Sequence, residues 1–336
     1  MSFLKKLFAI CIVLALLAGA GLYFWANQPI QASVQNVPPQ AMPFTIKPGS
    51  NLRNAADQIV AAGIPVNAEL LTLLARLTWQ ADKIKAGSYE LKPGTTPNIL
   101  LRQMVRGQFA QESLVIIEGW TFRQMRKAVA EHPGLKHDTT DLTDVQLLAK
   151  ISPEAKHPEG LFFPDTYLFA KGASDLQIYR QANTALTTHL NEAWSKRDPS
   201  LPYKTPYEAL IMASIVEKET GKKEDRNTIA GVFINRLKAG MLLQTDPSVI
   251  YGMGEQYSGN IRKRDLQTDT AYNTYTRTGL PPTPIALPGA ESLRAALAPA
   301  ATDALYFVAR GDGSSQFSSN LDDHNRAVNK YIRGGN

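Results

Sequence analysis

The sequence contains only one cysteine and five histidines, and this scarcity excludes several kinds of chemistry. The cysteine, Cys11, lies inside a long apolar run, so the rest of the chain has no thiol for a disulfide, a cysteine zinc site or a covalent nucleophile. The histidines show neither an HExxH motif nor the spacing of paired metal ligands. A GxSxG motif, a complete GxGxxG motif and a Walker loop are also missing. We therefore expect no metal and no cofactor.

Charge of one sign is not in large excess either. Lys and Arg number 36 against 30 Asp and Glu, which gives a formal net charge of +6. This mild excess argues against a nucleic-acid binder, and it suits an anionic polymer or a membrane surface equally well. Hydrophobic residues make up 44% of the 336 residues, so the chain is long and apolar enough for two or three folding units, each with its own core.

An uncharged apolar run extends from Leu7 to Trp25 and predicts a membrane-spanning helix. The run is longer than the core of a signal peptide and ends in three aromatic residues, although Ala18-Gly19-Ala20 leaves a cleaved signal as an alternative. Lys5 and Lys6 precede it, and the first acidic residue is Asp57. The positive-inside rule then makes residues 1–6 a cytoplasmic stub and places the chain after residue 25 outside.

A linker and a small repeat-containing module follow the span. Residues 26–43 are rich in proline and lack periodicity, which is typical of a spacer. A strand, a glycine turn and a helix capped by Ser or Thr are then indicated three times, beginning at residues 44, 89 and 114, with a further helix over 68–79. A common local preference for strand, turn and helix would explain any single copy, but three copies predict an α+β module.

The first two copies, with the helix between them, resemble a LysM domain. This resemblance implies a βααβ fold that binds the N-acetylglucosamine backbone of peptidoglycan. We assign residues 44–112 to this LysM-like module and residues 113–336 to a mixed α/β domain. In the second domain the patterns predict helices over 175–196, 291–297 and 322–332, and strand-like runs over 249–252 and 304–309.

One helix of the second domain ends in an unusual carboxylate. Thr205-Pro206 and Glu208 are typical of a helix start, residues 209–216 are apolar or small on every face, and Gly221 is a helix end. Glu217 therefore lies in the last turn of a buried helix, where desolvation and the helix dipole disfavour its ionised form, as a general acid requires. The alternative is that Glu217 belongs only to the solvated, charged end of a core helix.

Helical geometry gives Glu217 a different face from Glu219. Glu217 shares its face with Leu210, Ala213 and Ser214, which are expected to leave room for a ligand, whereas Glu219 points elsewhere, about 200° around the helix. Ser214 is therefore a candidate substrate-binding residue beside Glu217.

Two polar and aromatic segments are candidates for a sugar site. Gln244, Thr245 and Asp246 precede the run over 249–252, and Tyr272 and Asn273 precede a proline-stiffened loop. Amides, hydroxyls and aromatic faces together suit a pyranose ring with an acetamido group. Each residue also has a structural alternative, because Asx and Ser/Thr turns use the same side chains.

Several motifs together carry a resemblance to a known family. These are EGLFFPDTY, ASIVEKET, GVFINRL, LQTDPSVIYG, YNTY and GLPPTPI, in this order. They resemble the endolytic murein transglycosylase (MltG, YceG-like) family, whose catalytic glutamate maps onto Glu217. The resemblance implies a single-pass protein of the bacterial inner membrane with a periplasmic catalytic domain. It also implies cleavage inside nascent peptidoglycan strands, which terminates glycan elongation, and peptidoglycan synthases are candidate partners.

The reaction that the resemblance implies needs one acid rather than two. The acid protonates the oxygen between N-acetylmuramic acid and N-acetylglucosamine and then deprotonates the muramic C6 hydroxyl, which closes a 1,6-anhydro ring. Glu159, Asp165 and Asp246 are candidates for a second carboxylate; otherwise they anchor loops, and we count Glu159 as substrate-binding. Two alternatives stay open: a hydrolytic muramidase, and a non-catalytic scaffold that binds peptidoglycan.

Overall fold

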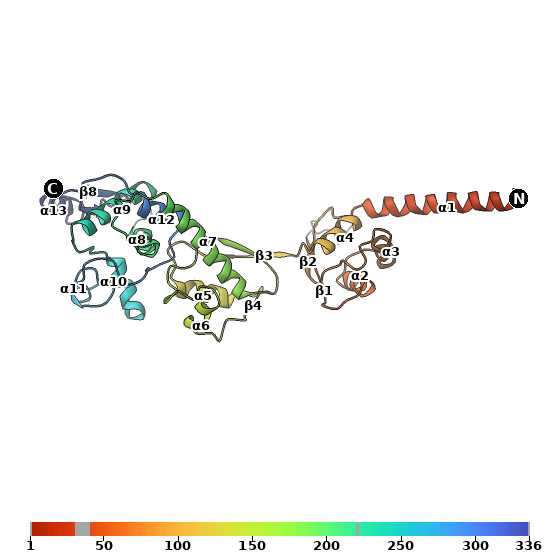
Figure 1. The fold of residues 1–336 in the computed structure, drawn as a ribbon, viewed down its shortest axis with the longest axis horizontal. Helices are drawn as coiled ribbons and strands as arrows, with labels where there is room; N and C mark the ends of the chain where they lie inside the picture. The colour runs from red at the N-terminus through yellow and green to blue at the C-terminus, as the bar shows by residue number, and fades with distance from the viewer. Residues whose placement is uncertain (1, 31–40, 220–221, 335–336) are drawn as a thin grey trace. The chain divides into compact units, whose positions relative to one another are not determined.

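The computed structural model describes residues 2–30, 41–219 and 222–334. The chain forms two compact units (Figure 1). Unit 1 comprises residues 1–112 and 168–173, and unit 2 comprises residues 113–167 and 174–336. Each unit has its own hydrophobic core. The candidate site lies in unit 2.

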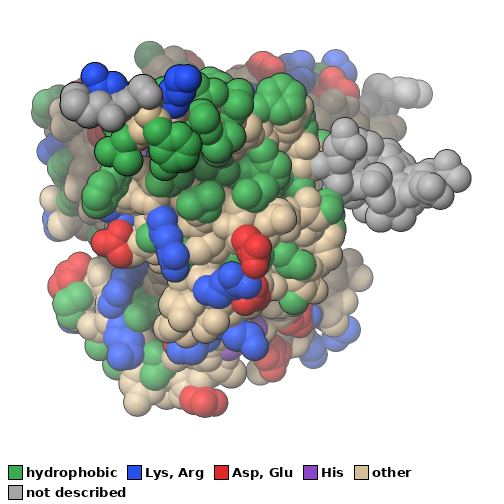
Figure 2. All heavy atoms as spheres, turned by 90° about the vertical axis from the view of Figure 1, so that its right-hand side faces the viewer, with side chains coloured by type: hydrophobic (Ala, Val, Ile, Leu, Met, Phe, Trp, Pro, Cys, Tyr) green, Lys and Arg blue, Asp and Glu red, His purple; other side chains and the backbone are tan. Residues whose placement is uncertain are grey.

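Unit 1 begins with the predicted apolar helix, α1 (Ser2–Asn27). Its stretch Phe3–Asn27 is long and apolar enough to cross a membrane. Hydrophobic side chains gather on the exposed surface of this helix, as Figure 2 shows from the N-terminal side. Only its end joins a core, where Ala26 is buried and Trp25 packs against the remainder of the unit. The expected single span is therefore present as a helix.

The rest of unit 1 has the expected βααβ order. Strands β1 and β2 pair antiparallel, with Phe44 opposite Tyr89 and their rings stacked 5.3 Å apart. Asn51, rather than the predicted Ser or Thr, caps the first helix by accepting a hydrogen bond from the Asn54 N–H, since an amide oxygen caps as well as a hydroxyl. The elements are β1 (Met42–Ile46), α2 (Leu52–Ala61), α3 (Ala68–Leu77), β2 (Gly87–Leu91) and α4 (Pro97–Arg106).

Unit 2 opens with the third copy of the strand, turn and helix. Thr121 caps its helix in a reciprocal capping box with Gln124, and Phe122 stacks on Phe162 in the core. Strand β3 pairs with β5, and β4 pairs with β6. Residues 111–112 and 168–173, which include parts of β3, β5 and β6, belong to unit 1. The elements are β3 (Gln111–Val115), α5 (Phe122–Glu131), β4 (Leu135–Lys136), α6 (Asp144–Ala149), β5 (Thr166–Ala170) and β6 (Ala173–Ser174).

The remainder of unit 2 is mainly helical and is built around α8, which packs against α7, α9, α10 and α12. Every residue from 209 to 216 is buried, as the all-round apolar pattern predicts. The elements are α7 (Asp175–Ser195), α8 (Pro206–Glu219), α9 (Lys223–Lys238), α10 (Asp246–Met253), the 3-10 turn η1 (Gly254–Gln256), α11 (Lys263–Gln267), α12 (Ala290–Leu297), β7 (Tyr306–Ala309), β8 (Ser315–Ser318) and α13 (Leu321–Tyr331).

The structure corrects one element of the prediction. Residues 249–252, expected to be strand-like, belong to helix α10. Asp246 and Pro247 lie in its first turn. The helix dipole stabilises a carboxylate there, and proline fits because the N–H groups of the first turn have no partner within the helix. The short apolar run that follows fits a strand or a buried helix equally well, so the helix start decides. The predicted helix end at Gly221 lies outside the described residues; α8 is described as far as Glu219.

Candidate active site

Glu217 lies in the last turn of α8, directly after the fully buried stretch, and is itself half-buried. Its Oε2 accepts a hydrogen bond of 3.0 Å from the backbone N–H of Gly289, the N-cap residue of α12. Among the described residues, the other oxygen, Oε1, accepts no hydrogen bond. The carboxyl group is thus anchored through one oxygen to backbone 72 residues away in sequence.

A stretch of paired backbone fixes the position of Gly289. The Gly119 N–H donates to the Leu287 carbonyl over 2.9 Å, and the Leu287 N–H donates to the Trp120 carbonyl over 2.7 Å. Lys218 Nζ donates to the Gly119 carbonyl over 3.3 Å, which ties the same stretch to α8. Because Gly119 has a φ of +76°, a residue with a side chain is strained at this turn. Residues 118–120 and 287–289 thus form a surface of paired backbone beside Glu217, which we call the backbone wall.

A second carboxylate, Glu118, lies on this wall and was not predicted from the sequence. A Cβ added to Gly289 would lie 1.9 Å from Glu118 Oε1, so the Glu118 carboxyl fills the space that the missing side chain leaves. Burial raises the pKa of Glu118, and the charge of Glu217 raises it further, while Arg226 lowers it. The only sequence signal is a glutamate before a turn glycine in LVIIEGWT. Such a residue has no periodicity that marks it, because its partners come from distant segments.

Thr245 and Asp246 gather around Glu219. Thr245 Oγ1 donates a 2.5 Å hydrogen bond to Glu219 Oε1, and Asp246 Oδ1 accepts one of 2.5 Å from the Tyr275 hydroxyl. Burial raises the pKa of Glu219 to about 7, the Thr245 hydrogen bond opposes this, and the Asp246 charge adds to it. The raised pKa that a general acid needs is therefore found at Glu219.

Gln244 is held in a strained conformation by a buried cation. Its φ is +51°, which side-chain-bearing residues adopt at a cost on the order of 1–2 kcal/mol. Its backbone N–H donates to the Thr274 carbonyl, and its Oε1 accepts from Arg236. Arg236 is 7% exposed and also donates to the carbonyls of Leu305, Leu242 and Leu243. The exposed Gln244 side chain thus belongs to a rigid corner before α10.

Four of the predicted binding residues are almost completely buried, among them Thr245, which is 1% exposed. Ser214 is 0% exposed; its hydroxyl donates to the Ile211 carbonyl and accepts from the Ile285 N–H. Asn273 is 1% exposed, and its Nδ2 donates to three backbone carbonyls at the C-terminal end of α11, those of Asp265, Leu266 and Thr268. Glu159 is treated below. The predicted room for a ligand beside Ser214 is therefore absent, because Leu210 and Ala213 are fully buried too.

Glu159 and Tyr272 are connected through Tyr251. Glu159 is 3% exposed; Oε1 accepts from the Phe122 N–H over 2.9 Å, and Oε2 accepts from the Tyr251 hydroxyl over 3.1 Å. Burial raises the pKa of Glu159 to about 7, and these hydrogen bonds oppose the rise. The Tyr251 and Tyr272 rings meet edge to face at 4.9 Å, and the Tyr272 hydroxyl bonds Thr283. Glu159 therefore joins α5 to α10 from inside, whereas Asp165 is exposed at the start of β5.

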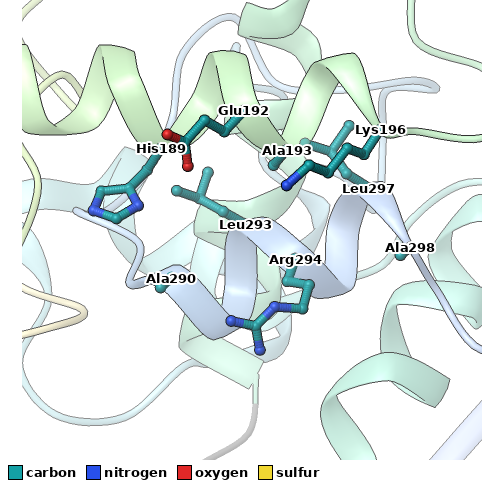
Figure 3. A pocket seen from close by; sticks show the side chains of 9 residues that line it. All are labelled: His189, Glu192, Ala193, Lys196, Ala290, Leu293, Arg294, Leu297 and Ala298. Atoms are coloured by element: carbon teal, nitrogen blue, oxygen red, sulfur yellow. The ribbon is translucent and has the colours of Figure 1, made fainter.

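A cavity of ≈ 370 Å³ lies between α7 and α12 (Figure 3). Its walls combine apolar side chains such as Leu293 with charged ones from both helices, Glu192, Lys196 and Arg294. Ala290, at one end, directly follows Gly289, but Glu217 does not line the cavity. Within residues 2–30, 41–219 and 222–334, no three His, Cys, Asp or Glu side chains are placed to hold a metal ion.

Comparisons with known proteins agree on one family. The sequence model of the YceG-like family matches residues 44–330 of the chain. The chain is 34% identical over 285 residues to the endolytic murein transglycosylase of Bacillus subtilis (strain 168), covering 76% of this chain and 75% of that protein. It is 29% identical over 323 residues to the protein of the same name from Streptococcus pneumoniae serotype 2 (strain D39 / NCTC 7466), and this match covers 85% of this chain and 58% of that longer protein.

A solved structure shows the same relationship. The crystal structure of the yceG-like protein lmo1499 from Listeria monocytogenes matches with a TM-score of 0.53 and 30% sequence identity. The match covers 86% of this chain and 99% of the Listeria chain.

Proposed function

The chain belongs to the YceG-like family, and we propose that it acts on peptidoglycan with Glu217 as the acid and base of the reaction. It is a membrane-anchored endolytic lytic transglycosylase: the relatives that are 29–34% identical over most of the chain are named endolytic murein transglycosylase, and α1 supplies the anchor. Its substrate is the glycan strand of peptidoglycan. The residues that carry out the cleavage are our assignment and follow from the geometry of unit 2.

The anchoring of Glu217 supports its role. The Gly289 N–H holds Oε2, and Oε1 has no hydrogen bond within the described residues, so the carboxyl keeps one oxygen for a substrate. The fixed oxygen restricts rotation of the group, which orients the other for proton transfer. In Glu219, by contrast, Thr245 occupies Oε1 and burial desolvates the carboxyl. The Gly289 hydrogen bond is the observation on which the assignment of Glu217 depends.

The chemistry requires one group to act twice. Protonated Glu217 gives its proton to the oxygen between N-acetylmuramic acid and N-acetylglucosamine while the bond from C1 to that oxygen breaks. The acetamido oxygen acts as an internal nucleophile and bonds to C1 as the glycosidic bond breaks; this second bond breaks in turn when the C6 oxygen takes its place at C1. The Glu217 carboxylate then takes the proton of the muramic C6 hydroxyl, and the C6 oxygen bonds to C1. No water is consumed, so the second carboxylate that ordinary glycosidases use as nucleophile or base is not required.

The residues predicted to bind sugar divide by exposure. Gln244 and Asp246 are exposed and Tyr272 is partly exposed, so we assign these three to contact with the glycan. The others act from inside by holding the loops that present those three: Ser214, Thr245, Asn273 and Glu159.

The membrane arrangement is also proposed. Helix α1 spans the cytoplasmic (inner) membrane once, with its N-terminus in the cytoplasm and the second domain in the periplasm. Lys5 and Lys6 supply the positive charge at the inner end. Peptidoglycan synthases are the proposed partners, and the LysM-like module contacts glycan. Protease added to spheroplasts should degrade the chain after residue 27 and leave the N-terminal stub, and protection of both units would contradict this orientation.

End-group analysis tests the reaction. Purified glycan strands treated with the full-length protein should yield fragments with 1,6-anhydro ends, and Glu217→Gln should abolish them while Glu219→Gln, two residues away, retains activity. A hydrolytic muramidase gives reducing ends that are heavier by one water. A non-catalytic scaffold gives no new ends and is indifferent to either substitution. Activity in a folded Glu217→Gln protein with loss in Glu219→Gln would transfer the role to Glu219.

A further inference from the structure

We propose that the cavity between α7 and α12 binds the peptide stem attached to N-acetylmuramic acid, with Lys196 holding a stem carboxylate and Glu192 holding the free amino group of the stem. This inference rests on the proposed function and extends the substrate from the glycan strand to its peptide. The occupant is therefore a short acidic peptide on the sugar whose bond is cleaved.

The cavity starts beside the residue that fixes Glu217. The Gly289 N–H, at the N-cap of α12, binds Glu217 Oε2, and the next residue, Ala290, lines the cavity. From there the cavity follows α12 as far as Ala298, a distance of about 12 Å at a rise of 1.5 Å per residue. A chain that leaves the reacting sugar along α12 therefore runs into this cavity.

The proposed reaction places the start of the stem at the same point. Glu217 acts on the bond at C1 of N-acetylmuramic acid, and the peptide is attached to the same sugar through the lactyl group on its C3 oxygen. The stem has free carboxylates and, before it is cross-linked, one free amino group. Charge-assisted hydrogen bonds to these groups require a cation and a carboxylate close together on the enzyme.

Lys196 and Glu192 supply this pair. Both are exposed, lie four residues apart at the end of α7, and form no ion pair with each other or with another described residue. Figure 3 shows the Lys196 ammonium directed into the cavity and the Glu192 carboxylate on the side of His189. The Arg294 guanidinium, by contrast, already donates to Glu291 over 2.6 Å. The two unpaired charges are therefore available to a ligand.

The other lining residues give the cavity its size and an apolar surface. Its volume of ≈ 370 Å³ lies in the range of ligand sites, about 300–1,000 Å³. Leu293 and Leu297 offer contact to the aliphatic parts of a peptide, and His189 is fixed by stacking on Phe163 with ring centroids 4.1 Å apart. A second cavity of ≈ 510 Å³ shares three lining residues with the first, Lys196 among them, so a longer stem has room to continue.

Kinetics on two forms of the same glycan test the proposal. One form has its peptides, and in the other an amidase has removed them. On peptide-bearing strands, Lys196→Met should raise KM by about two- to fivefold with kcat unchanged, and on peptide-free strands both constants should equal those of the wild type. Lys204→Met is the matched control, because it removes the same charge from an exposed residue of unit 2 that does not line the cavity, and it should change neither constant.

Glu192→Gln separates a specific site from general attraction between a basic surface and an acidic peptide. General attraction predicts a lower KM when a carboxylate is removed from the enzyme. The proposal predicts a KM that is higher by about two- to fivefold on peptide-bearing strands. Acetylation of the free amino groups of the stems should remove this difference, because the ammonium that Glu192 binds is then gone.

Four results would overturn the inference: unchanged constants in both cavity variants, an equal rise of KM on peptide-free strands, a Lys204→Met effect as large as that of Lys196→Met, or a KM that Glu192→Gln lowers.

The binding of both strands to the Glu217→Gln protein repeats the comparison without cleavage. Peptide-bearing strands should bind more tightly than peptide-free strands, and Lys196→Met in the same protein should remove the difference. A folded Glu217→Gln protein that still cleaves glycan would refute the proposed role of Glu217 and leave this binding comparison intact.

Discussion

Thr245 Oγ1 donates a 2.5 Å hydrogen bond to Glu219, whereas Glu217, two residues earlier on the same helix, is bound by the Gly289 N–H. The two carboxyls at the end of α8 therefore face different parts of unit 2. Glu217 meets the backbone wall and Glu118, and Glu219 meets the corner that begins α10. We therefore propose one acid of this helix end, Glu217, for the reaction and the other, Glu219, for the structure of the corner that begins α10.

The buried Glu159 should make stability depend on pH. Its pKa is raised to about 7, so the folded state binds its proton more tightly than the unfolded state does. This contribution is fully present below the unfolded pKa, near 4.5, and is lost as the pH rises to about 7. The unfolding free energy of the wild type should therefore fall by about 2–3 kcal/mol between pH 4.5 and 7, and Glu159→Gln should remove this fall. Thermal melts of both proteins across this range measure it, with Glu255→Gln, an exposed carboxylate, as control.

Arg236 should stabilise the folded protein through its buried hydrogen bonds. Its guanidinium donates to three backbone carbonyls and to Gln244, so Arg236→Met leaves buried acceptors without donors. We expect a loss of about 2–4 kcal/mol in the free energy of unfolding, measured by urea denaturation. Arg310→Met changes an exposed arginine of the same unit and should cost far less. Equal losses in the two variants would show that the buried hydrogen bonds are not the cause.

Gln244 should show opposite effects on stability and activity. Gln244→Gly relieves the positive φ and should raise the free energy of unfolding by about 0.5–1 kcal/mol, while kcat/KM falls because the side-chain amide is lost. Trp79 provides a matched control: its φ is +58° and its side chain is 83% exposed in unit 1. Trp79→Gly should relieve the same strain with kcat/KM unchanged. A Gln244→Gly enzyme with full activity would remove this side chain from the glycan site.

Ser214 should act through the loop that it holds. Ser214→Ala deletes the acceptor of the Ile285 N–H and should cost about 1–2 kcal/mol of stability. The same change loosens the proline-rich loop and should raise KM for glycan more than it lowers kcat. Ser248→Ala is the comparison: its buried hydroxyl bonds Thr245 and Thr274 instead, so it leaves the Ile285 N–H bonded. A KM unaffected by Ser214→Ala would contradict the loop-holding role.

Local sequence patterns were sufficient for the elements that depend on neighbouring residues. The uncharged run from Leu7 predicts α1, alternation and turn glycines predict the βααβ order, and the apolar stretch over 209–216 predicts a buried α8. The failure at 249–252 has a local cause as well, because a four-residue apolar run lacks the length that separates strand from helix. The position of Glu217 at the end of α8 belongs to this predictable part.

The sequence by itself determined the membrane helix, the βααβ module, the buried helix and the glutamate at its end, because periodicity, capping and length act within a few residues. Only the tertiary structure decided what surrounds that glutamate. Gly289 and Glu118 reach it from distant segments, and Thr245 and Asp246 lie beside Glu219. The physical reason is that backbone pairing between residues 119–120 and 287, together with the packing of α8 against α10 and α12, brings these groups together. No local pattern records which distant backbone a side chain will meet.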